Sequence, residues 1–339
     1  MKLKTIAAPI VAALLAATPA LADTSGKRIA LSNNYAGNTW RQAMLKSWET
    51  VTKVAVAQGK VREVSAFTTA ENQVTEQAAQ IQNLILQGYD AIVLDAASPT
   101  ALNGSIKAAC DAGIVVVSFD GIVTEPCAYR VQVDYKELGA RQVEYLATRL
   151  PKGGNLLEIR GIAGSSIDDD LHTGIMRGVE KHPQFKIVAS VYGDWTQTVA
   201  QKAVAGVLPS LPAIDAVVTQ GGDGTGAAEA FRVAGRPTPI IILGNRYDEL
   251  AWWKKQRETN GYTTFSGTIA PGISTLAFWV AQQVLDGKQL PKDVTVPYLT
   301  VAQEDIDTVL ARTPVGGVAN VEYTQADAEK ILRDLADAK

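Results

Sequence analysis

The sequence predicts an α/β fold of two doubly wound parallel-sheet lobes joined by a three-strand hinge, and three observations lead to this fold class. Short apolar runs alternate with amphipathic segments of helical length, which is the pattern of parallel strands joined by crossover helices. Residues 114–119 are apolar on both strand faces, as a sheet covered by helices on both sides requires. A break at residues 131–134 divides the series into two similar halves, and 339 residues suit about two domains.

The first half shows repeated strand–helix units. Glycine follows each helix, at Gly59, Gly88 and Gly113, because glycine adopts the left-handed backbone that ends a helix. We assign residues 27–131 and 272–297 to an N-terminal lobe. The strands are expected at residues 28–31, 61–66, 91–95 and 114–119, and the helices at residues 40–58, 71–86, 99–112 and, from later in the chain, 273–286.

The second half repeats the alternation. We assign residues 132–270 and 298–339 to a C-terminal lobe, whose last forty residues form an appendage with a helix at 325–335. The hinge crossings are expected near residues 131–134, 270–271 and 297–300. A strand at residues 129–133 and a helix at 135–150 open this half, and further strands are expected near residues 156–160, 187–191, 216–219, 240–243 and 263–268.

The first 22 residues have the form of a secretory signal peptide. Lys2 and Lys4 form a basic start, an apolar run at residues 6–17 is too short to span a bilayer, and residues 20–22 read Ala-Leu-Ala. We expect cleavage after Ala22 and export to the periplasm. The loss of two lysines takes the net charge from −3 to −5, and a mildly acidic chain argues against a nucleic-acid partner.

The only two cysteines in the sequence are Cys110 and Cys127, on either side of the apolar run at residues 114–119. In an oxidising compartment an even pair of cysteines is typical of a disulfide. We expect the pair to meet at one edge of the first sheet.

Polar and aromatic side chains gather where strands of the first half end. The run at residues 28–31 leads into a loop dense in amides, with Asn34 and Asn38 followed by Trp40 and Arg41. The buried strand at residues 114–119 ends on Asp120, whose carboxylate can accept from two adjacent hydroxyls of a sugar or polyol. In open α/β sheets ligands bind beyond the carboxyl ends of the strands, so these residues predict a ligand site.

The second half carries its own set of candidates. A glycine-rich loop at residues 161–166 precedes three consecutive aspartates, of which we expect one to face the cleft. We assign this role to Asp169, with Asp168 as the alternative. Trp195 follows a later strand and can oppose Trp40 across a sugar ring. The loop at residues 220–226, with Asp223, and then Asn245 can offer further contacts to hydroxyl groups. Asp168–Asp170 invite a metal ion, but adjacent helical residues diverge by about 100° and cannot converge on one ion.

Catalytic motifs are scarce. His172 and His182 are not accompanied by a nucleophile in a motif context, so we expect a protein that is not an enzyme and needs no cofactor or metal. The loop at residues 220–226 can be aligned with a dinucleotide-binding fingerprint, but the acidic residue expected after the next strand is absent. An exported NAD-dependent oxidoreductase is therefore the weaker alternative.

These features together resemble the ribose- and galactofuranose-type periplasmic sugar-binding proteins of ABC importers, which have the type I fold. The motifs that carry the resemblance are the signal peptide, Val117–Asp120 and the loop at residues 161–166, and it covers about residues 27–297. The resemblance implies hinge closure of a monomer on a neutral sugar or polyol, and delivery to membrane permease subunits. It places sugar contacts at Asn38, Trp40, Arg41, Asp120, Trp195 and Asn245.

Several positions depart from this family pattern. The arginine usual after the aspartate is Gly121 here, and the arginine of the glycine-loop helix aligns with Asp169. Gly221 and Pro271 replace an asparagine and a glutamine. A pocket with fewer arginines suits a neutral sugar, whereas an anionic sugar is disfavoured, although Arg41 and Arg246 keep it possible. A sugar sensor for a chemoreceptor would share the same ligand chemistry and stays an alternative. A related repressor would need a DNA-binding helix-turn-helix where the signal peptide stands.

Overall fold

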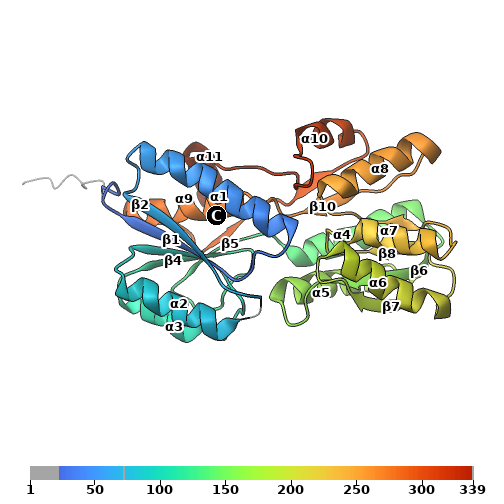
Figure 1. The fold of residues 1–339 in the computed structure, drawn as a ribbon, viewed down its shortest axis with the longest axis horizontal. Helices are drawn as coiled ribbons and strands as arrows, with labels where there is room; N and C mark the ends of the chain where they lie inside the picture. The colour runs from blue at the N-terminus through green and yellow to red at the C-terminus, as the bar shows by residue number, and fades with distance from the viewer. Residues whose placement is uncertain (1–22, 72, 338–339) are drawn as a thin grey trace, which may run out of the picture.

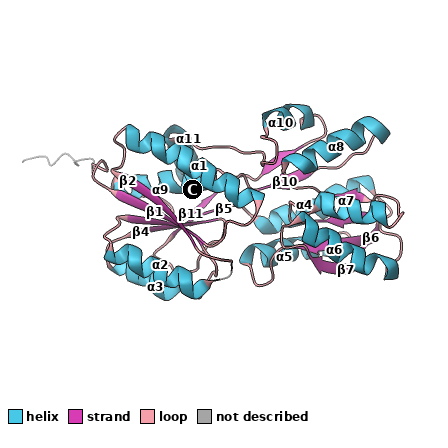
Figure 2. Ribbon diagram, viewed as in Figure 1, coloured by secondary structure: helices cyan, strands magenta, loops and turns pink. Residues whose placement is uncertain are grey.

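The computed structural model describes residues 23–71 and 73–337, so the expected signal peptide and its cleavage site lie outside the described residues. The chain forms two lobes that lie side by side, with blue to cyan segments mostly in one lobe and green to yellow segments mostly in the other (Figure 1). In each lobe the strands lie between helices (Figure 2). The predicted α/β class and two-lobe organisation are confirmed.

The first lobe is built on a six-stranded sheet in the order β11-β5-β4-β3-β1-β2, in which every neighbouring pair is parallel. Helices α1, α9 and α11 cover one face and α2 and α3 the other (Figure 1). The strands are β1 (Arg28–Asn33), β2 (Glu63–Thr68), β3 (Ala91–Asp95), β4 (Val115–Phe119), β5 (Tyr129–Gln132) and β11 (Asp293–Thr295), and the helices are α1 (Thr39–Ala57), α2 (Val74–Leu86), α3 (Asn103–Asp111), α9 (Ile273–Leu285) and α11 (Gln325–Asp337).

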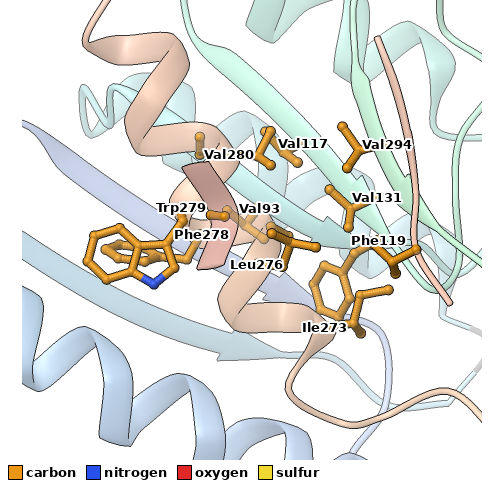
Figure 3. Close-up of a cluster of buried hydrophobic side chains, with 14 of the residues drawn as sticks. Val93, Val117, Phe119, Val131, Ile273, Leu276, Phe278, Trp279, Val280 and Val294 are labelled. Carbon is orange, nitrogen blue, oxygen red and sulfur yellow. The ribbon is translucent and has the colours of Figure 1, made fainter. Parts of the chain in front are cut away.

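Helix α9 forms the centre of the first lobe's core, although it comes from late in the chain. Eleven of its residues are buried, because the helix is apolar on nearly all sides. Leu276 and Val280 lie near valines of β3 and β4, and Ile273 lies beside Phe119 (Figure 3). Burying each such side chain stabilises the fold by about 1.5–3 kcal/mol.

The second lobe has a four-stranded parallel sheet in the order β7-β6-β8-β9. Helices α4 and α5 pack closely because Gly139 and Gly174 lie in their interface: a Cβ at Gly174 would lie 2.0 Å from the Lys136 carbonyl oxygen. The strands are β6 (Gly154–Arg160), β7 (Phe185–Tyr192), β8 (Ala216–Val218) and β9 (Ile240–Ile241), and the helices are α4 (Tyr135–Arg149), α5 (Ser166–Lys181), α6 (Gln197–Val207), α7 (Gly224–Val233), α8 (Tyr247–Asn260) and α10 (Ile306–Arg312), with a short 3-10 helix at Leu208–Ser210.

The strand expected at residues 263–268 is shorter than predicted and does not extend the second sheet as a full strand. Only β10 (Ser266–Thr268) forms, and it pairs antiparallel with β12 (Leu299–Val301) in a separate two-stranded sheet. This small sheet joins two of the chain segments that pass between the lobes. The described chain passes between them at residues 133–134, 269–272 and 296–298, close to the expected hinge.

The last helix corrects the sequence assignment. We assigned residues 298–339 to the C-terminal lobe, but α11 packs on α9 of the first lobe, with Ala328 and Leu332 buried in that core. The chain therefore crosses between the lobes a fourth time, at residues 319–324. Asn320 anchors this crossing: its Oδ1 accepts from the Gly272 amide at 2.7 Å and its Nδ2 donates to Ser47 Oγ at 2.7 Å. The amphipathic pattern of α11 predicts a helix, but does not indicate which lobe covers its apolar face.

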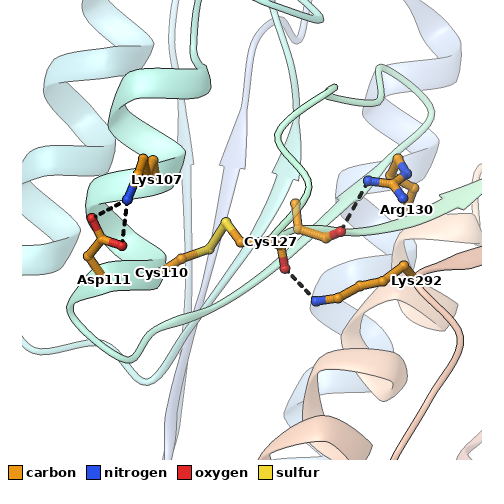
Figure 4. Close-up of a disulfide and its surroundings, with 7 residues drawn as sticks. Lys107, Cys110, Asp111, Cys127, Arg130 and Lys292 are labelled. Atoms are coloured by element: carbon orange, nitrogen blue, oxygen red, sulfur yellow. Dashed lines mark hydrogen bonds and ion pairs between the residues drawn. A yellow bond between two sulfur atoms is a disulfide. The ribbon is translucent and has the colours of Figure 1, made fainter.

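The predicted disulfide between Cys110 and Cys127 is present, with an S–S distance of 2.06 Å (Figure 4). Cys110 lies at the end of α3, and Cys127 lies in the loop just before β5. Lys292 Nζ also holds this loop by donating to the Cys127 carbonyl at 2.6 Å. Both cysteines lie at the amino ends of their neighbouring strands, which is the sheet edge opposite Asp95 and Asp120.

Removal of this disulfide is expected to lower stability without changing ligand affinity. The double variant C110S/C127S should lose about 3 kcal/mol of unfolding free energy, because the bridge no longer restricts the unfolded chain. Urea denaturation of oxidised wild type, reduced wild type and the variant measures this loss. Equal midpoints for oxidised wild type and the variant would contradict the expectation.

Candidate functional site

A cavity between the two lobes lies at the carboxyl ends of the strands of both sheets. Its volume is about 70 Å³, several times the roughly 10–15 Å³ that one water needs, so it can hold a small ligand. Residues of both lobes and of the crossings line it. The apolar part of the lining is Leu138, Ile167, Leu171, Ile269 and Val318, and the indoles of Trp40 and Trp195 also line it.

The start of α1 positions the first-lobe side of the cavity. Asn38 is the N-cap residue, and its side chain accepts from the Arg41 amide at 2.8 Å. This turn places Trp40 and Arg41 in the cavity lining. Trp40 Nε1 donates to the carbonyl of Ile269, in one of the crossings, at 2.8 Å. This bond uses the only donor of the indole, so a ligand can contact only the ring face.

Arg41 is buried between two carboxylates. Its guanidinium is in direct contact with Asp95, and its Nη2 lies 3.3 Å from Asp120 Oδ2. Burial lowers the pKa of Arg41, and the carboxylate of Asp120 acts against that change. The guanidinium is therefore held in place before any ligand binds, and its single positive charge faces two negative charges.

Asp120 connects the two lobes. It follows β4 in the left-handed backbone region, with φ 55°, which aspartate tolerates better than most residues. The hydroxyl of Tyr135, the first residue of α4 in the second lobe, donates to Asp120 Oδ1. Burial and the Asp120 carboxylate raise the pKa of Tyr135 well above its ordinary value, so the phenol stays a donor. Asp120 keeps acceptor capacity for ligand hydroxyls.

Trp195 forms the opposing wall. Asp194 and Trp195 both have positive φ, 52° and 50°, in the tight turn after β7. The indole lies over Gly161, where a Cβ would come within 2.3 Å of Trp195 Cε2, so only glycine leaves room for this ring. Trp195 Nε1 donates to Gln220 Oε1 at 3.2 Å. The structure thus brings Trp40 and Trp195 to one cavity from opposite lobes.

A second guanidinium, that of Arg246, lines the cavity from the second lobe. It donates to the Trp195 carbonyl at 2.7 Å and to the Gly222 carbonyl at 3.2 Å, and so links the loops after β7 and β8. The buried carboxylate of Glu249 accepts from the backbone amides of Gly222 at 3.2 Å and Gly244 at 3.1 Å. Glu249 therefore fixes the two glycine loops that carry this side of the cavity.

Asn245 lies in the cavity lining as predicted, but its amide is occupied. Its Nδ2 donates to the Leu299 carbonyl at 2.8 Å, and its Oδ1 accepts from Ser266 Oγ at 2.5 Å. These bonds hold β12 and β10 to the loop after β9. Asn245 has only part of its acceptor capacity left for a ligand.

The expectation that Asp169 faces the cleft is wrong. Its side chain is 68% exposed and lies 3.1 Å from Arg160 Nη2, and Asp169 is not among the residues that line the cavity. Asp168 is fully buried, but its carboxylate accepts from Arg160, at the end of β6, and from Gln220, in the loop after β8. Asp170 pairs with Lys136 at 3.0 Å. The first turn of α5 directs Ile167 to the cavity instead. The sequence pattern predicts the helix, but not which residue of its first turn faces the cavity.

Asn34 and Asp223 lie near the cavity without lining it. Asn34 lines a smaller cavity of about 40 Å³ beside it, and its Nδ2 donates to the Ala96 carbonyl at 2.9 Å. Asp223 is completely buried in the turn before α7, and neither of its carboxylate oxygens has a hydrogen-bond partner of good geometry among the described residues. Burial raises the pKa of Asp223 well above its ordinary value, against the opposing effect of Arg246.

The buried Asp223 predicts a pH-dependent stability. A carboxyl whose pKa is higher in the folded than in the unfolded chain destabilises the fold as the pH rises between those two pKa values. Asp223→Asn is therefore expected to raise the Tm at pH 7, and the gain should vanish below about pH 3.5, where both states of the wild type are protonated. Thermal unfolding across this pH range measures the difference. A gain of the same size at both ends, or none at pH 7, would contradict this expectation, and the exposed Asp169→Asn is the control.

Comparison with known proteins places the chain in a family. The model of a family described as "Periplasmic binding protein domain" matches residues 29–289. The chain belongs to this family. A solved ABC transporter solute binding protein from Thermobispora bispora is similar to this periplasmic binding protein, with a TM-score of 0.86 and 34% identity over 92% of this chain and 96% of the other.

Two curated relatives are more distant. A xylitol-binding protein from Mycolicibacterium smegmatis is 28% identical over 80% of this periplasmic binding protein and 74% of its own length. A ribose import binding protein from Bacillus subtilis is 24% identical over 67% of this chain and 73% of its own length. The family and the fold agree with the resemblance found in the sequence.

The sequence reasoning missed two polar residues around the cavity of this periplasmic binding protein, Asp95 and Tyr135. It included Gln220 only as part of the loop at residues 220–226 and considered Arg246 only as a possible partner of an anionic sugar. Asp95 and Gln220 each stand at or just after the end of a buried strand, the same signal that identified Asp120. Arg246 follows the predicted Asn245. Tyr135 opens a helix after a crossing, and no local pattern marks it as a partner of Asp120.

In the described part of the chain, no group of three or more metal-ligating side chains is placed to hold a metal ion. His172 Nδ1 instead lies 2.7 Å from the buried Glu158 carboxylate, away from the cavity. Among the described helices, none combines the length and apolar character that crossing a membrane requires.

Proposed function

We propose that this protein is the solute-binding component of an ABC sugar importer and that it binds a neutral monosaccharide or polyol in the cavity between its lobes, without altering it chemically. The observation that carries the proposal is the placement of Trp40 and Trp195, from opposite lobes, in the lining of one small cavity that Asp120 and Arg41 share. The apolar C–H faces of a sugar pack on aromatic rings, while its hydroxyls bond to charged groups at the ring edge.

The charges of the lining support a neutral ligand. The charge of Arg41 is more than offset by two carboxylates, and Arg246 lies near the buried carboxyls of Asp223 and Glu249. Neither guanidinium is left without a nearby acidic group, as one that receives a ligand carboxylate would be. The names of the two curated relatives refer to xylitol and ribose, which are both uncharged polyhydroxy compounds.

Hinge closure is the mechanism that fits this geometry. A ligand in the cavity touches both lobes only when they are closed, so binding shifts the population toward the closed form. In the structure, the hydrogen bond from Tyr135 to Asp120 joins the second lobe to the first. The bond from Trp40 to Ile269 joins the first lobe to a crossing. We further propose that the protein acts as a monomer, that it is exported to the periplasm after cleavage behind Ala22, and that it delivers its ligand to membrane permease subunits.

A thermal-shift screen tests the ligand class. The purified mature protein is heated with pentoses, hexoses, deoxysugars and polyols, and with sugar acids as the charged comparison. We expect at least one neutral compound to raise the Tm by several degrees, because a ligand at 1,000 times its Kd adds about 4 kcal/mol of stability. Titration calorimetry then gives the affinity, and NMR of the recovered ligand tests that it is unchanged.

Two results would overturn the proposal. If only sugar acids shift the Tm, the neutral ligand class is wrong. If absorbance at 340 nm changes when the protein is incubated with NAD and the bound sugar, the protein is an oxidoreductase rather than a carrier.

A further inference from the structure

The cavity wall around Arg41 contains more negative than positive charge. Asp120 lines the cavity, whereas Asp95 lies behind Arg41, is fully buried and lines neither the main cavity nor the smaller one beside it. Asp95 contacts Nη1 of Arg41 directly, and Asp120 Oδ2 lies 3.3 Å from Nη2. One guanidinium therefore faces two carboxylates, and only one of these carboxylates is in a position to touch a ligand.

Gly121, in the loop after β4, helps to hold Asp95 in this place. The amide of Gly121 donates to Asp95 Oδ1 at 3.3 Å. A Cβ at Gly121 would lie 2.9 Å from that oxygen and 2.7 Å from the Ala96 carbonyl oxygen, so any other residue at 121 would displace the carboxylate or the backbone beside it. The loops after β3 and β4 are thus shaped to accommodate a carboxylate that the ligand does not contact.

A carboxylate in this position changes which ligands the cavity accepts. An arginine in a cavity wall is the usual partner of a ligand carboxylate, because its donors match the two oxygens. Asp95 occupies one side of that guanidinium and adds a buried negative charge, which water screens poorly. A neutral sugar is little affected by this charge, whereas an anionic sugar is repelled by it. Specificity is a difference of affinities, and repulsion of the wrong ligand contributes to it directly.

We propose that Asp95 is a specificity-determining positioning residue, which holds Arg41 and excludes anionic sugars from the cavity. The inference rests on the proposed function, since it concerns the charge of the ligand in that same cavity. It assigns the discrimination to a residue that does not touch the ligand.

The test compares matched neutral and anionic ligands. Dissociation constants are measured by calorimetry for three pairs: xylitol and D-xylonate, D-ribose and D-ribonate, and D-galactose and D-galacturonate. The proteins are the wild type, D95N and the control D90N. Asp90 directly precedes β3, at the end of the strand opposite Asp95, and it accepts from Lys27 Nζ at 2.9 Å. D90N therefore removes the same charge at a position away from the cavity.

For the pair that contains the best neutral ligand, we expect the ratio of anionic to neutral Kd to be large in the wild type. In D95N the ratio should fall by about 10-fold or more, mostly through tighter binding of the anion, while D90N keeps the wild-type ratio. An unchanged ratio in folded D95N would overturn the inference but leave the proposed function standing. Failure of the wild type to bind any neutral sugar or polyol would overturn the proposed function itself.

A second pair of variants keeps the test decisive if D95N does not fold. R41Q and R41Q/D95N differ only in the charge at position 95. In the double variant, no buried carboxylate at position 95 is left without its guanidinium partner. The double variant should bind the anionic ligands more tightly than R41Q by about the same factor. Equal ratios in these two variants would also overturn the inference.

Discussion

Asp120→Ala is expected to weaken binding of the neutral ligand by at least about 100-fold while the two lobes stay folded. Among the described residues that line the cavity, Asp120 carries the one carboxylate, and its loss leaves ligand hydroxyls without an acceptor. Each buried group left unpaired costs about 1–3 kcal/mol, so two hydroxyls account for this loss. Titration calorimetry with the ligand from the thermal-shift screen measures the affinity, and circular dichroism tests the fold.

Two further variants make this result interpretable. Asp120→Asn removes the charge but keeps a residue that tolerates the positive φ of 55°, so it separates the effect of charge from that of backbone strain. Asp169→Ala makes the alanine change on a side chain that is 68% exposed, and should leave the affinity as in the wild type. Wild-type affinity in Asp120→Ala would exclude the proposed site.

Removal of α11 is expected to be the most destabilising change outside the cavity. Truncation after residue 324 exposes the face of α9 on which Leu332 and Ala328 pack, and removes partly buried Ile331 and Leu335. At about 1.5–3 kcal/mol for each fully buried large side chain, the unfolding free energy should fall by roughly 4–6 kcal/mol, and the Tm by about 10 °C. Calorimetry should show a separate early transition, because the loss is confined to the first lobe.

The matched control for this truncation is Lys330→Ala. Lys330 lies on the exposed face of α11 and pairs only with the exposed Asp334, so its loss should shift the Tm by less than about 1 °C. A truncated protein with the Tm of the wild type would show that α11 does not stabilise the first lobe.

Much of the fold was predictable because alternating parallel strands and helices leave a strong pattern of apolar residues. Part of the cavity lining was predictable for the same reason: Trp40, Asp120 and Trp195 each come after a strand, and the carboxyl ends of the strands meet at the cavity. Asp95 stands in the same kind of position, and the sequence reasoning overlooked it. The disulfide followed from the number and placement of the cysteines.

The rest depends on contacts that no local pattern encodes. Whether Ile167 or Asp169 faces the cavity depends on the register of the first turn of α5, which Asp168 fixes by binding Arg160 and Gln220. Which lobe α11 joins depends on its packing on α9. Helix α9 belongs to the first lobe, although it follows the elements of the second lobe in the sequence. Asn245 follows a strand, as predicted, but its side-chain amide is already bonded to the Leu299 carbonyl and to the Ser266 hydroxyl.

The fourth crossing has a practical consequence for following ligand binding by energy transfer between two fluorophores. Because α11 returns to the first lobe, residues 24 and 337 both belong to that lobe, where Thr24 Oγ1 accepts from Gln282 of α9 at 3.0 Å. Fluorescent proteins fused at these two ends would move together and keep their separation whether the cleft is open or shut. A responsive pair needs one fluorophore in the second lobe, and the exposed turn at Gly261, where a left-handed glycine ends α8, offers an insertion point that disturbs neither sheet.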